Sequence, residues 1–118
     1  MPYDAPPPAH VGQKIIEILC LVESGLYGEA VQKCAKSRVL PDDLKRVIDE
    51  YGRTPVLPPA DASERLNYIR IIDSKKYEYF VIAPFYTREE GLSDLNLQFN
   101  VTIYYDRVDV ELRDFRAM

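Results

Sequence analysis

The chain has 118 residues, of which 47% are apolar and 29% are charged, and its formal net charge is −4. This length suits one domain with a single core, and the composition excludes an intrinsically disordered chain. The acid excess argues against a nucleic-acid binder, because phosphate neutralisation needs a concentrated basic surface.

Membrane and metal functions find no support in the sequence. The longest apolar run, Ile18 to Val22, is too short to span a bilayer, and residues 1–8 lack the regions of a signal peptide, so we expect a cytoplasmic protein. Cys20 and Cys34 are expected to be buried free thiols. With His10 as the one histidine, they cannot form a usual zinc site without carboxylates, so we predict no metal or cofactor.

The first half of the chain predicts helices. Residues 1–10 are proline-rich and are expected to form a flexible lead-in to a single α+β domain over residues 11–118. Apolar residues at helical spacing predict a helix over Val11–Glu23, a shorter one over about Gly28–Ser37 and a third over Pro41–Tyr51. The third has proline at its first position and glycine just after its end, which are common helix boundaries.

The second half predicts strands. After a proline-rich crossing segment, branched and aromatic residues predict a hairpin of Leu66–Asp73 and Tyr77–Tyr86 around a polar turn. Apolar and polar residues then alternate over Asp94–Ile103 and Val108–Asp114, which predicts two more strands. The sequence therefore predicts an α+β fold, with three N-terminal helices packed on one face of a curved, four-stranded antiparallel meander sheet.

The face of this sheet away from the helices is expected to be polar. Some of three tyrosines are expected there as well, and such a face can bind a protein because tyrosine contributes large contact area. Two interpretations stay open: a protein-binding surface and an ordinary solvated face. The residues expected on this face are Asn96, Gln98, Asn100, Thr102, Tyr104, Asp109, Glu111 and Arg113, with Tyr68, Tyr77 and Tyr79 as the tyrosines.

The connection from Tyr86 to Leu95 concentrates three carboxylates, an arginine, two hydroxyl residues and a glycine. Paired acids can catalyse proton transfer or bind a metal, but both uses need a pocket or a fixed ligand set that the sequence does not show. The default interpretation is a capped turn, in which Gly91 has positive φ and Ser93 or Asp94 bonds to loop amides.

Several segments together resemble a family of small uncharacterised bacterial domains. They are Tyr51-Gly52-Arg53-Thr54, Pro58-Pro59, Thr87 to Leu95 and Val108 to Phe115, and the Glu-Gly-x-Ser-Asp-Leu motif within the third is the most specific. Such short acidic proteins resemble the immunity proteins of bacterial polymorphic toxin and contact-dependent inhibition systems. The order of helices and curved sheet is similar to nuclear transport factor 2 or cystatin-like layouts.

The resemblance implies a non-enzymatic immunity protein, an antitoxin that binds and neutralises a cognate, basic toxin by covering its active site. An acidic protein suits a basic partner, because opposite net charges speed association. The expected contact residues are Tyr86, Arg88, Glu89, Glu90 and Asp94, with Asp109 and Glu111 behind them.

Two alternatives remain open at this point. One is a small-ligand binder or enzyme with a pocket between helices and sheet, lined by Tyr51, Tyr68, Tyr79 and Phe85. The other is a self-associating structural module, in which an exposed edge strand pairs between two copies.

Overall fold

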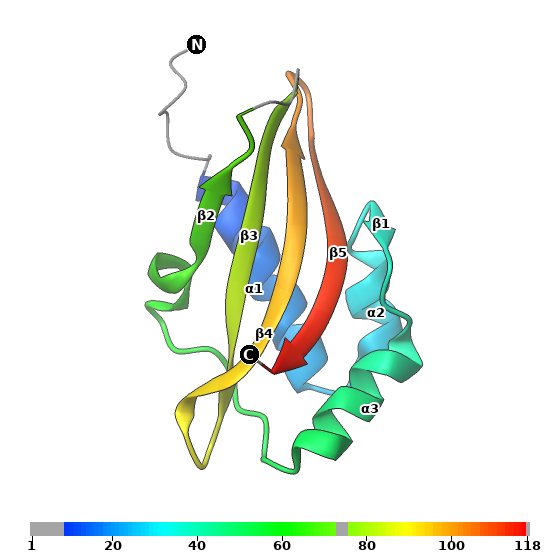
Figure 1. The fold of residues 1–118 in the computed structure, drawn as a ribbon, viewed down its shortest axis with the longest axis vertical. Helices are drawn as coiled ribbons and strands as arrows, with labels where there is room; N and C mark the ends of the chain where they lie inside the picture. The colour runs from blue at the N-terminus through cyan, green and yellow to red at the C-terminus, as the bar shows by residue number, and fades with distance from the viewer. Residues whose placement is uncertain (1–8, 73–75, 118) are drawn as a thin grey trace.

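A computed structural model describes residues 9–72 and 76–117 and has an α+β fold (Figure 1). Its helices are α1 (Ala9–Glu23), α2 (Tyr27–Gln32) and α3 (Pro41–Tyr51), with a 3-10 helix η1 (Ala62–Arg65). Its strands are β1 (Lys36–Ser37), β2 (Asn67–Arg70), β3 (Tyr77–Thr87), β4 (Gly91–Ile103) and β5 (Val108–Ala117).

The described residues form a five-stranded mixed sheet in the order β1-β5-β4-β3-β2. Strands β2 to β5 are the expected antiparallel meander, but β1 is an additional strand that lies parallel to β5. The prediction of four strands misses β1, because the second helix is predicted to continue through Lys36 and Ser37. That helix stops at Gln32, and the Ala35 and Arg38 N–H groups instead donate to the Val110 and Leu112 carbonyls at 2.8 Å.

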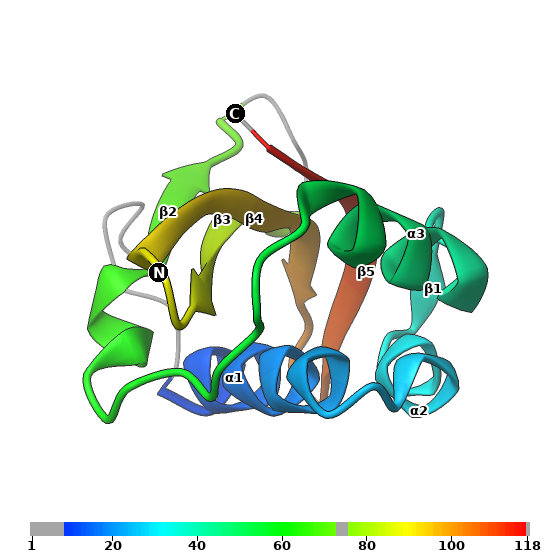
Figure 2. The same cartoon turned by 90° about the horizontal axis from the view of Figure 1, so that it is seen from below.

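The three helices do not share one sheet face. Figure 2 shows the sheet curving over α1, while α2 and α3 lie beside the edge formed by β5 and β1. The expectation that all three helices pack on one face is therefore corrected: α1 alone among them lies across the inner face. None of the described helices covers the opposite face, which we call the outer sheet face.

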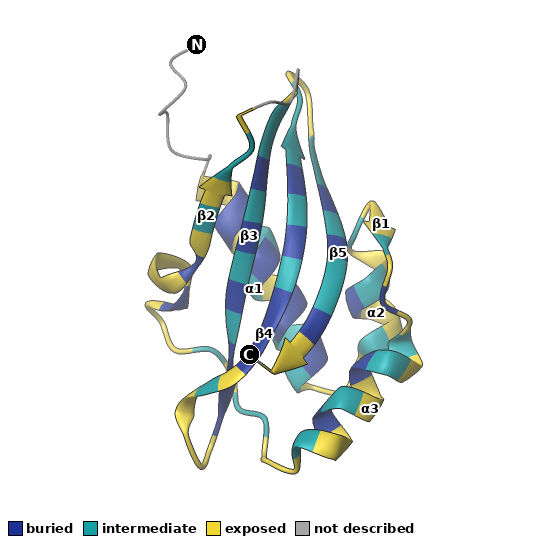
Figure 3. Ribbon diagram, viewed as in Figure 1, coloured by how far each residue is buried: buried dark blue, intermediate teal, exposed yellow. Residues whose placement is uncertain are grey.

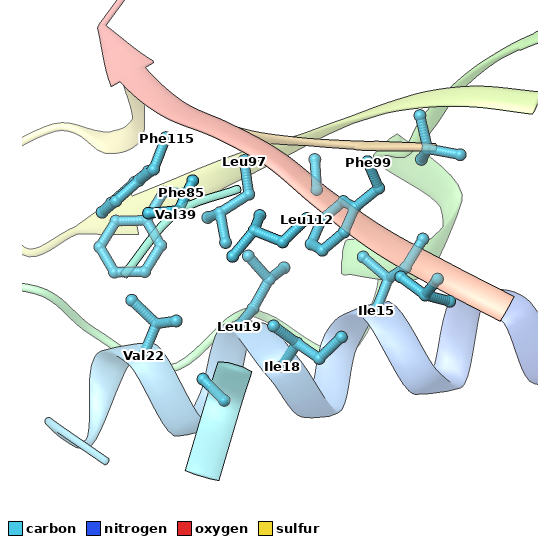
Figure 4. Close-up of a cluster of buried hydrophobic side chains, with 14 of the residues drawn as sticks. Ile15, Ile18, Leu19, Val22, Val39, Phe85, Leu97, Phe99, Leu112 and Phe115 are labelled. Atoms are coloured by element: carbon cyan, nitrogen blue, oxygen red, sulfur yellow. The ribbon is translucent and has the colours of Figure 1, made fainter. Parts of the chain in front are cut away.

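The core lies between α1 and the inner sheet face. The apolar stripe predicted for the first helix is fully inside it, with Val11, Ile15, Ile18, Leu19 and Val22 each at most 1% exposed. Figure 4 shows Ile15, Ile18, Leu19 and Val22 of α1 directed at side chains of the strands. The labelled strand residues there are Phe85, Leu97, Phe99, Leu112 and Phe115.

Burial alternates along the central strands, as the sequence predicts for a sheet with one buried face (Figure 3). In β4, Leu95, Leu97, Phe99 and Val101 are buried, whereas Gln98 and its polar neighbours on the other face are mostly half-buried. Because successive side chains of a strand point to opposite faces, this alternation assigns residues to the inner or the outer face, except at the register shifts between Pro84 and Tyr86 and between Gln98 and Phe99.

The predicted helix boundaries hold best for α3. It begins at Pro41, the Leu40 N–H donates to the Asp43 carboxylate at 3.0 Å, and Gly52 ends it with φ 75°. The first helix starts at Ala9, so Ala9 and His10 belong to it, while residues 1–8 of the expected lead-in lie outside the described residues. The predicted polar turn also lies outside them, apart from Lys76.

Both cysteines are free thiols, as predicted, and both are half-buried. The Cys34 thiol donates weakly to the Ala30 carbonyl, with sulfur and oxygen 3.5 Å apart. Burial raises the pKa of Cys34 to about 11.

Candidate functional site

Five of the predicted contact residues lie around the hairpin that joins β3 to β4, where the end of α3 meets it. The Tyr51 hydroxyl donates to the Glu90 carboxylate, whose two oxygens lie 2.8 and 2.9 Å away, and accepts from the Asp94 N–H at 3.2 Å. Glu89 accepts from the N–H and the hydroxyl of Thr54, each at 2.9 Å. We call this set of Tyr51, Thr54, Glu89, Glu90 and Asp94 the hairpin junction.

Backbone contacts strengthen the hairpin junction. The Arg88 N–H donates to the Thr54 carbonyl at 2.8 Å, the Val56 N–H donates to the Tyr86 carbonyl at 3.1 Å, and Pro55 forms an isolated bridge with Thr87. These backbone hydrogen bonds hold the segment that follows α3 alongside the end of β3. Two of the motifs on which the family resemblance rests, distant in sequence, contact each other here and hold the fold together.

The electrostatics of the hairpin junction agree with this internal role. Hydrogen bonds from Thr54, first its backbone N–H, lower the pKa of Glu89, so the carboxylate is held in its charged form. Burial, and then the hydrogen bond to Glu90, raise the pKa of Tyr51 and keep its hydroxyl protonated as a donor. Both carboxylates act mainly as acceptors for their own chain.

The turn itself has the capped geometry that was the default interpretation. Gly91 has φ 70°, a conformation that favours glycine. The Ser93 hydroxyl donates to the Phe85 carbonyl at 2.6 Å and accepts from the Leu95 N–H at 3.1 Å. The hairpin is tighter than expected, because β3 continues to Thr87 and β4 starts at Gly91.

The remaining predicted residues near the hairpin differ in accessibility. Tyr86 is only 6% exposed, and its hydroxyl has no hydrogen-bond partner within residues 9–72 and 76–117, so it offers almost no surface to a partner. Burial raises the pKa of this phenol. The side chains of Arg88 and Asp94, in contrast, are exposed.

Asp109 and Glu111 lie elsewhere, around a hollow on the outer sheet face. The hollow has a volume of about 320 Å³ and is bordered by side chains of β3, β4 and β5 and by the chain around β1; we call it the outer hollow. Its lining consists of Ala35, Lys36, Lys76, Glu78, Asn100, Thr102, Tyr104, Asp109 and Glu111.

The charged groups of the outer hollow have several intramolecular partners. The Asn100 amide donates to the Glu78 carboxylate at 3.1 Å. Glu111 pairs with Arg38 at 3.5 Å and with Arg113 at 3.7 Å. Asp109 pairs with Arg107 at 3.4 Å, again between partly exposed side chains.

The seven predicted contact residues therefore do not form one site. Asp109 pairs with Thr102 across β4 and β5, and Thr102 lies eight residues along β4 from Asp94. At the rise of a β-strand this is about 27 Å, so the hairpin junction and the outer hollow are separate surfaces.

The three tyrosines expected on the outer sheet face lie on the inner face. Tyr77 and Tyr79 pair with Ile103 and Val101, and residues directly opposite in an antiparallel pair share a face. Tyr68 joins them, with its ring 5.9 Å from that of Tyr79 in an edge contact. The outer positions of β3 carry Glu78, Phe80, Ile82 and Pro84 instead.

Sequence reasoning missed Glu78 and Lys36 as parts of the outer hollow. The assignment of faces along β3 failed because this strand has large apolar or aromatic side chains on both faces. Lys36 carries no sequence signal, since it reaches the hollow only through the parallel pairing of β1 with Glu111 on β5.

The four residues proposed to line a ligand pocket contribute to the core. Tyr79 and Phe85 are 5% and 2% exposed, and Tyr51 and Tyr68 pack against the same cluster. Phe85 also makes an edge contact with Phe115, with ring centroids 5.3 Å apart. Since these side chains belong to the core or pack against it, the pocket hypothesis gains no support from them.

Two further observations concern the described part of the chain as a whole. Residues 9–72 and 76–117 contain no group of three or more His, Cys, Asp or Glu side chains arranged to hold a metal ion. No helix within those ranges has the length and apolar character needed to cross a membrane.

Comparison with known proteins identifies a family but no function. No curated protein and no solved structure matches the chain. One family model, described as a domain of unknown function, DUF7668, matches residues 19–118. Because this match covers the core helix from Leu19 onward, the whole sheet, the hairpin junction and the outer hollow, the chain belongs to the DUF7668 family.

Proposed function

We propose that this chain is a non-enzymatic immunity protein, which neutralises a basic toxin domain by binding it through the outer sheet face. The observation that carries the proposal is the outer hollow, where carboxylates from β3 and β5 border one depression on a sheet face that none of the described helices covers. Polar sheet faces of this kind can be buried against a partner without loss of the fold beneath.

Three carboxylates of the outer hollow can accept hydrogen bonds from a basic partner. Glu78, Asp109 and Glu111 line it beside Lys36 and Lys76, and in the free chain Arg38, Arg107 and Arg113 pair with Glu111 and Asp109. The net charge of −4 acts in the same direction at long range and would raise the association rate with a positively charged protein.

The existing ion pairs of β5 do not block such binding. Arg38 and Arg107, which pair with Glu111 and Asp109, have side chains that are 61% and 55% exposed. Exposed ion pairs typically contribute less than about 1 kcal/mol. A partner's arginine or lysine can therefore replace Arg107 beside Asp109 at small cost, whereas Glu111 is 23% exposed and also pairs with Arg113.

The hairpin junction contributes less to this interface than the sequence predicts. Glu89 and Glu90 are exposed but accept hydrogen bonds from their own chain, and Tyr86 is buried, whereas Arg88 and Asp94 are exposed. A standard interface covers about 800 Å² of each partner, roughly 30 Å across. An interface of this size centred on Asp109 and Glu111 reaches about 15 Å, which leaves Arg88 and Asp94 outside it, because Asp94 lies about 27 Å along the sheet from Asp109.

The test is a binding titration. Candidate toxin domains encoded beside this gene are expressed as catalytically inactive forms, and their affinity is measured for the wild-type chain and for Asp109→Lys/Glu111→Lys. The matched control is Asp49→Lys/Glu50→Lys, which makes the same charge change on exposed residues of α3. We expect a loss of affinity of at least about a hundredfold for the first variant, as for buried charge pairs, and little change for the control.

A second measurement asks whether binding protects. Co-expression of the active toxin with the wild-type chain should restore growth, and co-expression with Asp109→Lys/Glu111→Lys should not. Equal affinity of both double variants, or growth rescue by a chain that does not bind the toxin, would rule out the outer sheet face as the inhibitory surface.

A further inference from the structure

Strand β2 forms one edge of the described sheet. It pairs with β3 from Asn67 to Arg70 in an uninterrupted antiparallel register, and within the described residues no strand lies beyond it. The opposite edge, β1, is only two residues long. Of the two edges, β2 therefore offers the longer run of backbone for pairing.

The hydrogen-bond pattern shows which backbone groups of β2 point outward. The Ile71 N–H donates to the Glu78 carbonyl at 3.1 Å, so this pair is of the hydrogen-bonded type. Hydrogen-bonded pairs occur at every second residue of an antiparallel ladder, and Asn67 and Ile69 therefore also direct their groups to β3. The N–H and carbonyl of Tyr68 point the other way, towards the open edge.

The side chains at this edge are unusually apolar. Ile69 is 46% exposed, and Ile72, just beyond the strand, is 79% exposed. Ile69 pairs with Phe80 on the outer sheet face, and Ile82 follows on the same face of β3; both are half-buried. An apolar strip thus runs from the sheet towards the edge.

Apart from its length of four residues, β2 has few of the usual devices that protect an edge strand. The strand contains no lysine and no proline, and its register with β3 has no bulge. Its one charged residue, Arg70, has its guanidinium 4.0 Å above the ring of Tyr77, on the inner side of the sheet. That charge therefore does not project from the edge towards an incoming strand.

We propose that this edge is a self-association surface, on which the β2 strands of two copies pair antiparallel about a two-fold axis beside Tyr68. Around this axis the Tyr68 N–H of each copy donates to the Tyr68 carbonyl of the other, and Asn67 faces Ile69. The two Ile69 side chains then lie diagonally across the new pair, about 7–8 Å apart and within reach of each other.

The chain's own charge distribution favours a second copy as the occupant. Although each copy carries a net charge of −4, the three central residues that meet, Asn67, Tyr68 and Ile69, are uncharged, so the axis brings no like charges together. Two paired strands of this length bury less than the roughly 1,600 Å² of a standard interface. The dimer is therefore reversible, and its population depends on the protein concentration. The pairing leaves the outer hollow itself open, but Ile69 lies three strands from Glu111 on the same outer sheet face, about 14 Å away, so the second copy sits beside the proposed toxin interface.

The first test is sedimentation equilibrium of the full chain over a wide concentration range. The weight-average mass of the wild type should rise from 13.6 kDa towards twice that value. Ile69→Lys places a charge beside the axis and should raise the dissociation constant at least about tenfold. Leu40→Lys is the matched control, because Leu40 is 64% exposed but lies before α3, and it should dimerise as the wild type does.

The second test is amide hydrogen exchange of the wild type, followed by nuclear magnetic resonance. The Tyr68 amide should exchange rapidly in dilute solution and slow down as the dimer forms, with no comparable change at Ile69, whose N–H already bonds to β3. A wild-type chain that stays monomeric throughout overturns the proposal. So does a dimer that survives Ile69→Lys while the Tyr68 amide continues to exchange rapidly.

Discussion

Glu89 and Thr54 show how a single residue can look like a binding group in the sequence and act as a structural one. The two oxygens of the Glu89 carboxylate accept separate hydrogen bonds from one residue, both at 2.9 Å. Charge-assisted hydrogen bonds of this kind are stronger than neutral ones. The carboxylate therefore orders the segment that follows α3, although its side chain is exposed.

Glu89 makes the stability of the protein sensitive to acid. Its folded pKa lies below its ordinary value of 4.5, so its contribution to stability is present above that value and is lost as pH falls through the folded pKa. We expect the free energy of unfolding, measured in urea, to fall between about pH 5 and pH 3. Glu89→Gln should flatten this fall. Glu29→Gln, an exposed change on α2, should leave it unchanged.

Cys34 should react slowly in the folded protein. With the pKa of its thiol raised to about 11, only about one molecule in a thousand carries the thiolate at pH 8, and the thiolate is the reactive form. We expect alkylation by iodoacetamide to be at least about tenfold slower in buffer than in urea, where the thiol regains a pKa near 9.0. Mass spectrometry of the Cys34 peptide measures both rates, and equal rates would contradict the burial of this side chain.

At the scale of elements, the hairpin junction connects α3 to the β3–β4 hairpin through few groups. Tyr51 is central, because its hydroxyl donates to Glu90 and accepts from the Asp94 N–H. The ring of the same residue packs against the core. Helix α3 is thus anchored at its last residue, which positions the chain that crosses to η1.

Removal of the Tyr51 hydroxyl should weaken this anchor. We expect Tyr51→Phe to lower the free energy of unfolding by about 1 kcal/mol, because it leaves Glu90 and the Asp94 N–H without one partner each. Tyr27→Phe, a similar change on a half-buried tyrosine of α2, is the control. In a double-mutant cycle, Tyr51→Phe and Glu90→Ala should be coupled, since each removes the same hydrogen bond. Additive effects would show that the hydrogen bond contributes nothing.

At the scale of the whole molecule, one core connects helix α1, strands β2 to β5 and the helices α2 and α3 beside the sheet edge. Leu97 lies at its centre with no exposed surface, near Leu19 and Leu112. A single core predicts cooperative unfolding, in which every part of the sheet is lost in the same transition.

Leu97→Ala should therefore destabilise the whole protein. The expected loss is about 3 kcal/mol, which combines the lost burial with the cavity left behind. Leu57→Ala is the control, because Leu57 is 61% exposed, and we expect a change below about 0.5 kcal/mol. Circular dichroism and tyrosine fluorescence during urea unfolding should give coincident transitions for both variants.

Helices α1 and α3 and strands β4 and β5 were predictable from the sequence because their signals are local. Period-3.6 and period-2 patterns follow from backbone geometry within each segment, and proline and glycine mark the ends of α3. The positive φ of Gly91 and the Ser93 hydrogen bonds were predictable for the same reason.

Tertiary structure decided the features that depend on distant partners. Strand β1 exists only because Val110 and Leu112 accept hydrogen bonds from Ala35 and Arg38, and two residues are too few to show a period. The faces of β3 were ambiguous because apolar and aromatic side chains occupy both of them. Glu89 and Glu90 bond to residues 35 and 39 positions earlier, so their role as internal acceptors, and the separate outer hollow, emerge only when the folded chain brings those segments together.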